Sequence, residues 1–190
     1  MDVFVTGGSG FLGQHLLRAL LRAGHGPRAL ARSDTTAQVV ADTGARVVRG
    51  DLGDAAALRA GMAGCDVIVH AAATTSPWGS RAHFQTVNVE GTTTVLSAAR
   101  LAGVGRLVFV SSEAVLADGA PLVQVDETRP RSARPVGNYA RSKADSERIV
   151  LSANAQDFTT LAVRPRLLWG PGDTTILPQI LNAARAGRFA

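Results

Sequence analysis

The glycine-rich run near the amino terminus restricts the fold of this chain more than any other feature. The sequence predicts a buried strand at residues 2–6 and a helix at residues 11–23. Between them, Gly7, Gly10 and Gly13 form a Gly-x-x-Gly-x-x-Gly pattern. Glycine permits a tight turn with positive φ, and free N–H groups at the start of a helix attract an anion. The pattern predicts that this turn binds the pyrophosphate of a dinucleotide, with a tight packing turn as the alternative. The expected contacts are Gly7, Ser9, Gly10, Phe11, Leu12 and Gly13.

Apolar runs and helical patterns alternate along the rest of the chain. Strands are predicted at residues 28–32, 45–49, 66–71, 107–111 and 160–164, and helices at residues 37–43, 54–62, 81–102, 139–153 and 176–185. Strands that are apolar on both faces and separated by helices are typical of a parallel sheet. Right-handed crossovers then give a Rossmann-type, doubly wound α/β fold with helices on both faces. Residues 116–136 break the alternation and are expected to form a loop near the functional cleft.

The only tyrosine and the only lysine of the chain, Tyr139 and Lys143, lie four residues apart. Residues i and i+4 share one face of a helix, which would hold the ammonium beside the phenol. A nearby positive charge lowers the pKa of a phenol, which suits it to proton transfer at a carbonyl or an alcohol. The alternative is a half-buried ring with a solvated lysine, because Tyr-x-x-x-Lys patterns often arise by chance.

The end of the second strand bears on the choice of coenzyme. In dinucleotide-binding folds an acidic residue at this place binds the ribose 2′-hydroxyl of NAD. Here Arg32 stands at the strand end and could bind a 2′-phosphate, so we expect NADP in preference to NAD. The alternative is that Arg32 is solvated and that Asp34 reaches back to the ribose. Asp51, after the third strand, is placed to bond the adenine amino group or, alternatively, to cap the next turn.

Charge and cysteine content narrow the classes of partner. The formal net charge of +5 would permit binding of an anionic ligand or of nucleic acid. The arginines are scattered, however, without a basic run or interleaved aromatic residues, so we expect no nucleic-acid partner. Cys65 is the one cysteine, which indicates a reducing compartment. The sequence shows neither a secretory signal pattern nor a long apolar stretch. We therefore expect a cytoplasmic protein with no membrane partner and no metal site.

With these residues assembled, the chain resembles the extended short-chain dehydrogenase/reductases, which include the NAD(P)-dependent epimerases and dehydratases. The resemblance runs through all 190 residues. Beyond the glycine turn, it is carried by Asp51-Leu52, His70-Ala71-Ala72-Ala73, Asn88-Val89-Glu90-Gly91-Thr92, Ser111-Ser112, Tyr139 to Lys143, Arg164-Pro165 and Trp169-Gly170-Pro171-Gly172-Asp173. The run Pro77-Trp78-Gly79 and the segment 169–188 most resemble the 3β-hydroxysteroid dehydrogenase branch.

The resemblance implies a role for each matching position. Tyr139 would exchange a proton with the substrate oxygen, and Lys143 would lower the pKa of Tyr139 and bond the nicotinamide ribose. Ser112 would orient the substrate oxygen, with Ser111 as the alternative, because one register slip separates them. Asn88 would brace the site, although a helix-surface amide is the alternative. Further cofactor contacts would come from Leu52, Ala71, Ala72, Ala73, Pro165 and Arg166.

Some positions stay open within this resemblance. Arg166 is bulkier and more charged than a pocket floor needs, so the sequence does not set its direction. His70 is interpreted as a buried strand-end residue rather than a catalytic one. Family members are usually longer, so residues 1–173 are assigned to the NAD(P)-binding domain and residues 174–190 to the start of an incomplete substrate-binding portion. The chain is accordingly interpreted as truncated at its C-terminal end.

The function implied is that of an NAD(P)-dependent short-chain dehydrogenase/reductase. It would transfer hydride between nicotinamide and a carbonyl or secondary alcohol of a small molecule, by resemblance a bulky, apolar, steroid-like one. One alternative is a sugar-nucleotide epimerase or dehydratase, which retains its cofactor. Another is a noncatalytic dinucleotide-binding module. The helices at residues 81–102 and 139–153 could pair with their symmetry mates in a homodimer.

Overall fold

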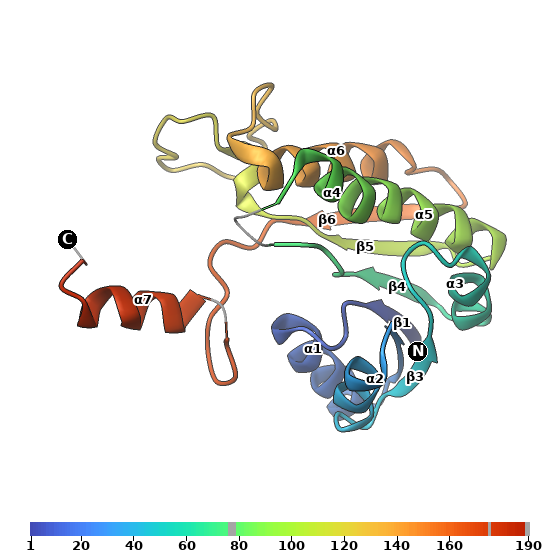
Figure 1. Ribbon diagram of the computed structural model, residues 1–190. Helices are drawn as coiled ribbons and strands as arrows, with labels where there is room; N and C mark the ends of the chain where they lie inside the picture. The colour runs from blue at the N-terminus through green and yellow to red at the C-terminus, as the bar shows by residue number, and fades with distance from the viewer. Residues whose placement is uncertain (76–78, 175, 189–190) are drawn as a thin grey trace.

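The sheet is wholly parallel and doubly wound. Figure 1 shows the computed structural model, which describes residues 1–75, 79–174 and 176–188. The described residues form a six-stranded sheet of order β3-β2-β1-β4-β5-β6, in which every adjacent pair is parallel. The strands are β1 (Asp2–Thr6), β2 (Gly26–Ala31), β3 (Arg46–Arg49), β4 (Val67–His70), β5 (Arg106–Val110) and β6 (Thr159–Val163). The predicted Rossmann-type fold is confirmed. Pro77 and Trp78, which contributed to the resemblance, lie outside the described residues.

Helices cover both faces of the sheet, as predicted (Figure 1). They are α1 (Phe11–Arg22), α2 (Asp34–Ala41), α3 (Ala55–Met62), α4 (Arg81–Phe84), α5 (Gly91–Leu101), α6 (Gly137–Ser152) and α7 (Ile176–Arg185). Val3 and Val5 of β1 belong to a buried cluster with Leu17 of α1. Phe4 belongs to a second cluster with Val150 of α6. Because successive strand residues point to opposite faces, β1 contributes to both layers of the core.

The helix predicted at residues 81–102 is continuous, but its middle turn is π-helical rather than α-helical. Between α4 and α5 lies η1 (Gln85–Glu90), a π-helical turn. π-turns are rare and occur mostly as single turns within α-helices, often at functional sites. The apolar spacing of the sequence gives no sign of this turn, which carries Asn88.

Helix α2 begins at Asp34 rather than at residue 37, and Ser33 is the reason. The Ser33 hydroxyl accepts the N–H of Thr36 at 3.2 Å, and the Thr36 hydroxyl accepts the N–H of Ser33 at 3.0 Å. This reciprocal capping box satisfies N–H groups at the start of the helix. The first turn of α2 is therefore fixed directly after the end of β2.

The carboxyl ends of the central strands bring the predicted site residues to one edge of the sheet. Thr6, the last residue of β1, is in register with His70, the last residue of β4. His70 is in register with Phe109 near the end of β5. The segments that follow these strands therefore lie side by side where the strand order reverses, which is where doubly wound sheets bind ligands.

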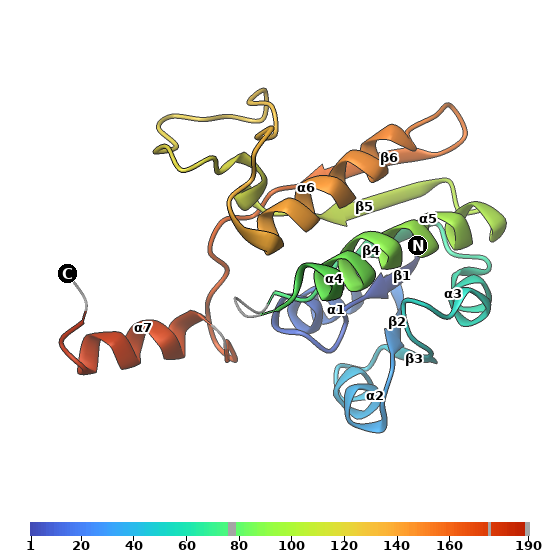
Figure 2. The ribbon, with the colours of Figure 1, turned by 45° about the horizontal axis from the view of Figure 1, so that its top comes forward.

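The C-terminal helix α7 lies apart from the sheet in both ribbon views (Figure 1 and Figure 2), and none of its residues is buried. Among the described residues, no helix combines the length and the apolarity that crossing a membrane requires.

Candidate active site

The glycine turn between β1 and α1 leaves no room for side chains. Gly7 has a φ of +75°, and a Cβ there would lie 2.7 Å from the amide nitrogen of Ala72. A Cβ on Gly13 would overlap the carbonyl oxygen of Gly7. Gly10 precedes α1 without a side-chain cap, and the first turn of α1 has no acidic residue. The turn therefore fits a pyrophosphate, whose charge the N–H groups and the dipole of α1 would attract.

Three other predicted residues belong to the same turn. The Ser9 carbonyl accepts a hydrogen bond from the Gln14 side chain at 3.1 Å. The Phe11 ring packs edge-on against His15, with ring centroids 4.9 Å apart. Leu12 is partly buried. Their place in the first turn means that an anion here would be met by backbone N–H groups rather than by these side chains.

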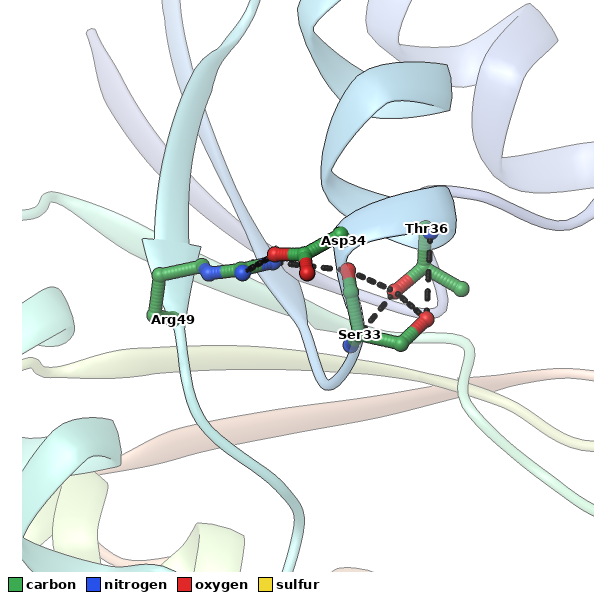
Figure 3. A network of polar contacts seen from close by, with 4 residues as sticks. All are labelled: Ser33, Asp34, Thr36 and Arg49. Carbon is green, nitrogen blue, oxygen red and sulfur yellow. Dashed lines mark hydrogen bonds and ion pairs between the residues drawn. The ribbon is translucent and has the colours of Figure 1, made fainter.

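Arg32 and Asp34, the two groups predicted to bear on the choice of coenzyme, follow the end of β2. Arg32 is exposed. Asp34 forms an ion pair with Arg49 of β3, and the same guanidinium donates to the Ser33 carbonyl at 2.7 Å (Figure 3). A ribose hydroxyl would have to compete with Arg49 for the Asp34 carboxylate. The exposure of Arg32 fits both its predicted contact with a 2′-phosphate and the alternative of a solvated strand end, so the choice of coenzyme stays a prediction.

Asp51 and Leu52 follow β3. The Asp51 carboxylate is exposed and accepts the N–H of Gly53 at 3.3 Å, which agrees with its alternative role in a turn. The cap of α3 is Asp54, which accepts the N–H of Ala57 at 2.9 Å. The Leu52 side chain packs against the apolar core. Asp51 thus presents a carboxylate at this edge, whereas Leu52 is directed inward.

Ala71, Ala72 and Ala73 continue β4 across from the glycine turn. The Ala71 N–H donates to the Thr6 carbonyl at 3.3 Å, and the Ala72 N–H donates to the Thr6 hydroxyl at 3.1 Å. The short distance from a Cβ on Gly7 to the Ala72 nitrogen shows that the backbone of the glycine turn approaches the backbone after β4 closely. All three alanines are only partly buried. Ala71 and Ala72 thus meet the turn by backbone, and the implied contact of all three alanines with the cofactor stays a prediction.

Ser112 and Tyr139 meet at the carboxyl edge. Ser112 caps η2 (Glu113–Leu116), with its hydroxyl oxygen accepting the N–H of Ala114 at 3.2 Å. Burial raises the pKa of Tyr139, and a hydrogen bond from Ser112 partly offsets that rise. Ser111, the alternative partner, donates instead to Glu147 at 2.6 Å and is buried. The two serines therefore face different groups, and Ser112 is the one beside the phenol.

A cavity of about 510 Å³ lies beside Tyr139, lined also by Thr75, Phe84, Gly137 and Asn138. The Phe84 ring meets the Tyr139 ring edge-on, with centroids 6.4 Å apart. The cavity thus combines an aromatic wall with a phenol hydroxyl, a mixture typical of small-molecule sites.

Burial sets the direction of the shift in the Tyr139 pKa, and the role of Lys143 in lowering that pKa stays a prediction. The Lys143 Nζ donates to the Val110 carbonyl at 2.6 Å and lies 4.1 Å from the centre of the Phe109 ring. Burial lowers the pKa of Lys143 to about 7, an effect that Glu147 partly offsets. The alternative of a solvated lysine is wrong, because only 3% of Lys143 is exposed. The spacing predicted a shared helix, but it could not predict how deeply the ammonium would be buried.

Asn88 is buried in η1, so the alternative of a surface amide is wrong. Its Oδ1 accepts the N–H of Thr74 at 2.8 Å, and its Nδ2 donates to the Thr74 carbonyl at 3.2 Å. The same Nδ2 donates to the Ser142 hydroxyl oxygen at 2.9 Å. Ser142 in turn donates to the Tyr139 carbonyl at 2.8 Å. Asn88 therefore connects the segment after β4 to the first turn of α6.

Pro165 and Arg166 follow β6 close to Ser112. The Pro165 carbonyl accepts the N–H of Glu113 at 3.1 Å. The Arg166 side chain is 80% exposed, and its Nε lies 3.2 Å from the Glu113 carboxylate. Arg166 is thus directed toward solvent, which answers the question that the sequence left open.

Glu147 is a central residue of this edge that the sequence interpretation missed. It is fully buried on α6, one turn beyond Lys143. Its carboxylate accepts hydrogen bonds from Ser111 at 2.6 Å, from Arg131 at 3.2 Å and from Arg164 at 2.8 and 3.1 Å. The i+4 spacing from Lys143 could have placed it on the same face, but an acidic residue ordinarily predicts a surface position. Glu147 joins the loop at residues 117–136 to the ends of β5 and β6.

Known proteins resemble this chain in sequence and in fold. Residues 4–190 match the 3-beta hydroxysteroid dehydrogenase/isomerase family. The 4-hydroxy-2-methyl-3-oxo-4-farnesyl-3,4-dihydroquinoline-1-oxide ketoreductase of Stigmatella aurantiaca is 53% identical over 189 residues. The 2-alkyl-3-oxoalkanoate reductase of Stenotrophomonas maltophilia is 40% identical over 192 residues. Each comparison covers 100% of this chain but 57% of the relative, so the chain spans little more than half the length of these curated proteins.

A solved structure extends the likeness to nucleotide-sugar enzymes. The dTDP-glucose 4,6-dehydratase of Streptomyces venezuelae, determined with NAD bound, matches with a TM-score of 0.83 at 31% identity. That match covers 98% of this chain and 63% of the dehydratase. The likeness agrees with the geometry of the glycine turn, which fits the pyrophosphate of a dinucleotide. It does not distinguish NADP from NAD.

Proposed function

Because this chain belongs to the 3-beta hydroxysteroid dehydrogenase/isomerase family, we propose that it acts as an NADP-preferring oxidoreductase on a carbonyl or secondary alcohol. The observation that carries the proposal is the place of the Tyr139 phenol, partly buried beside a cavity and close enough to Ser112 for that hydroxyl to lower its pKa. The glycine turn lies at the same edge of the sheet, where its N–H groups would hold the coenzyme pyrophosphate.

The protonation state of Tyr139 supports ketone reduction as the direction of the reaction. A phenol whose pKa is raised keeps its proton at pH 7, and ketone reduction requires a proton donor. When bound, a nicotinamide coenzyme supplies the hydride that goes to the carbonyl carbon. Ser112 orients the substrate oxygen, and the Tyr139 phenol gives its proton to that oxygen. In its charged form, Lys143 would stabilise the phenolate that remains.

The names of the two relatives support an apolar substrate. One name contains a farnesyl group and the other an alkyl chain, and both proteins are named as reductases of oxo compounds. Phe84 gives the cavity beside Tyr139 an aromatic wall. We assign a bulky apolar ketone, steroid-like in size, to this cavity. Residues 1–173 would bind the coenzyme, and residues 174–190, with the exposed helix α7, would begin the portion that contacts substrate.

The choice of NADP is supported by the charges at the end of β2. Arg32 is exposed there, while Asp34 is paired with Arg49. Fluorescence titrations with NADPH and NADH test this choice. The Arg32→Ala variant should lose roughly tenfold or more in NADPH affinity, because a charged hydrogen bond to phosphate is lost, and should bind NADH unchanged. Arg22→Ala, which removes the same charge at the end of α1, is the control. Equal binding of both coenzymes, insensitive to Arg32, would refute the preference.

The Tyr139→Phe variant tests the proposed chemistry. It removes one hydroxyl and should lower ketone reduction by at least about 100-fold, the contribution of a general acid, while coenzyme affinity stays unchanged. The unsubstituted protein must first show measurable ketone reduction, which is followed by the loss of NADPH absorbance. Undiminished turnover in Tyr139→Phe would refute its role as proton donor, and an absence of turnover in native and variant proteins would favour a noncatalytic binding module.

A nucleotide-sugar epimerase or dehydratase is the second candidate, favoured by the likeness to the Streptomyces venezuelae dehydratase. Such an enzyme would retain its coenzyme and show no net change in coenzyme oxidation state. Absorbance and mass spectrometry of the purified protein distinguish the two. Tightly held NAD and turnover of a nucleotide sugar without added coenzyme would favour this candidate over the ketone reductase.

A further inference from the structure

His70 is a buried imidazole that the proposed reaction does not use. Only 1% of the residue is exposed, and its ring lies 5.6 Å from the Phe109 ring, whose face also carries the Lys143 ammonium. Burial, together with the charge of Lys143, lowers the pKa of His70 to about 3. The imidazole is therefore neutral at pH 7, with one ring nitrogen that donates a hydrogen bond and one that accepts.

The neighbouring hydroxyl groups decide which nitrogen of His70 carries the proton. The Thr92 hydroxyl donates its single hydrogen to the Asn88 carbonyl at 2.5 Å, because a carbonyl oxygen can only accept. The His70 Nε2, 2.9 Å from the Thr92 oxygen, must then be the donor. It follows that Nδ1 is the acceptor and takes the hydrogen of the Thr6 hydroxyl, 2.6 Å away. The Thr6 oxygen still accepts the N–H of Ala72 at 3.1 Å.

On the Nε2 side, the hydrogen bonds lead to α6. The Thr92 hydroxyl donates to the Asn88 carbonyl. The Ser146 hydroxyl of α6 lies 2.8 Å from that carbonyl and 2.8 Å from the Ser142 carbonyl, so its one hydrogen has two acceptors. The Asn88 side chain donates to Ser142, which donates to the Tyr139 carbonyl. The Tyr139 backbone is thus connected to one nitrogen of His70 through hydrogen bonds that are buried, except for the partly buried one between Ser142 and Tyr139.

On the Nδ1 side, the hydrogen bonds lead to the coenzyme-binding turn. Thr6 is the last residue of β1 and directly precedes Gly7. The Thr6 hydroxyl oxygen accepts a hydrogen bond from the Ala72 N–H. The same Ala72 nitrogen is the atom that a Cβ on Gly7 would approach most closely. Thr6 and His70 are 64 residues apart in sequence, so this contact joins two segments that the fold alone brings together.

We propose that His70 is a positioning residue that fixes the coenzyme-binding turn relative to α6, with Nδ1 serving the turn and Nε2–H serving Asn88 and Tyr139. The proposal rests on the proposed function, because it assigns the turn to coenzyme and Tyr139 to proton transfer. Each ring nitrogen makes one polar contact, and both contacts are buried. The two halves of the role can therefore be removed separately.

Two amide substitutions separate these halves. In His70→Asn, the Oδ1 stands at the same number of bonds from Cβ as Nδ1, so it can still accept from Thr6 but cannot reach Thr92. In His70→Gln, the Nε2 stands where the imidazole Nε2 stood, so it can still donate to Thr92 but leaves Thr6 without its acceptor. Each variant thus keeps one polar contact and loses the other.

Two readouts report on the two sides. Coenzyme affinity, measured by fluorescence titration with NADPH and NADH, reports on the turn. The near-ultraviolet absorbance of tyrosinate reports on Tyr139 alone, because the chain has one tyrosine. His70→Gln should weaken coenzyme binding about fivefold or more, the fold-change that loss of one hydrogen bond produces, with the Tyr139 titration unchanged. His70→Asn should raise the titration midpoint of Tyr139, as the phenol moves away from Ser112, with coenzyme affinity unchanged.

The pattern of the two readouts decides the outcome. A merely structural role would move both readouts together in both variants, and that result would overturn the proposal, as would no change in either readout. If His70→Asn fails to fold, Thr92→Val takes its place, with Thr92→Ser as the control that keeps the hydroxyl. If His70→Gln fails to fold, Thr6→Val takes its place, with Thr6→Ser as the control. A native chain that binds neither coenzyme refutes the proposed function instead. The inference about α6 is then decided by the Tyr139 titration, which Thr92→Val should shift and Thr92→Ser should not.

Discussion

Replacing Glu147 by alanine should destabilise the fold more than most single substitutions. The change would leave Arg131 and Arg164 without their shared carboxylate and the Ser111 hydroxyl without its acceptor. Breaking a buried ion pair costs about 3–5 kcal/mol. The two arginine side chains are 29% and 20% exposed, so water can reach them once the carboxylate is gone. We therefore expect a loss of about 3 kcal/mol in the free energy of unfolding, at the lower end of that range.

Urea unfolding followed by circular dichroism measures this loss. With an m value of about 2 kcal/mol/M, the midpoint should fall by roughly 1.5 M while m stays unchanged. Asp145→Asn is the matched control, because the Asp145–Arg148 pair on the same helix is exposed and 3.9 Å long, and such pairs contribute less than about 1 kcal/mol. A loss below about 1 kcal/mol for Glu147→Ala, or one equal to that of the control, would refute the account of Glu147 as a buried junction.

Three further results are expected. Burial would raise the pKa of Glu147, but hydrogen bonds from Arg164, Ser111 and Arg131 outweigh burial and lower it. The contribution of Glu147 to the free energy of unfolding should therefore be complete above the unfolded pKa of 4.5 and be lost as pH falls through the lower folded pKa. The Glu147→Gln variant should lack this decline. The folded pKa of His70, about 3, lies below the ordinary value of 6.5 for a histidine. The free energy of unfolding should therefore fall by about 1.4 kcal/mol per pH unit as pH drops from about 6 to 4, and His70→Gln should remove that slope. Gly13→Ala would place a Cβ against the Gly7 carbonyl, whereas Gly53→Ala meets nothing within 4 Å; only the first should lower the melting temperature and coenzyme affinity, and equal effects would contradict the tight turn.

The layered fold could be predicted from the sequence because its signals are local. Strands buried on both faces, such as β1, appear as short apolar runs, and the glycine turn fixes where the first strand ends and the first helix begins. The start of α2 was misplaced because Ser33 and Thr36 cap each other, an interaction that competes with the apolar spacing on which the prediction relied. The π-turn that carries Asn88 has no local signal of this kind.

The candidate site was predicted in its members but not in its electrostatics. The spacing of Tyr139 and Lys143 placed both on one helix, yet the pKa of each depends on burial, which contacts distant in sequence decide. Asn88 meets Ser142 across 54 residues, and Ser111 meets Glu147 across 36 residues. A sequence pattern identifies which residues can take part in such contacts, whereas only the packed fold shows which partners they acquire.

Titration of Tyr139 tests the central claim most directly, since the claim is that this phenol keeps its proton at neutral pH and is hydrogen-bonded to Ser112. Tyrosinate absorbance of the folded chain, with circular dichroism to verify the fold at each pH, belongs to this residue alone. We expect a midpoint above the ordinary value of 10, because burial raises the pKa, and a further rise in Ser112→Ala, because the lost hydrogen bond lowered it. Ser111→Ala should leave the midpoint unchanged. A midpoint at or below 10, or one insensitive to Ser112, would contradict the account.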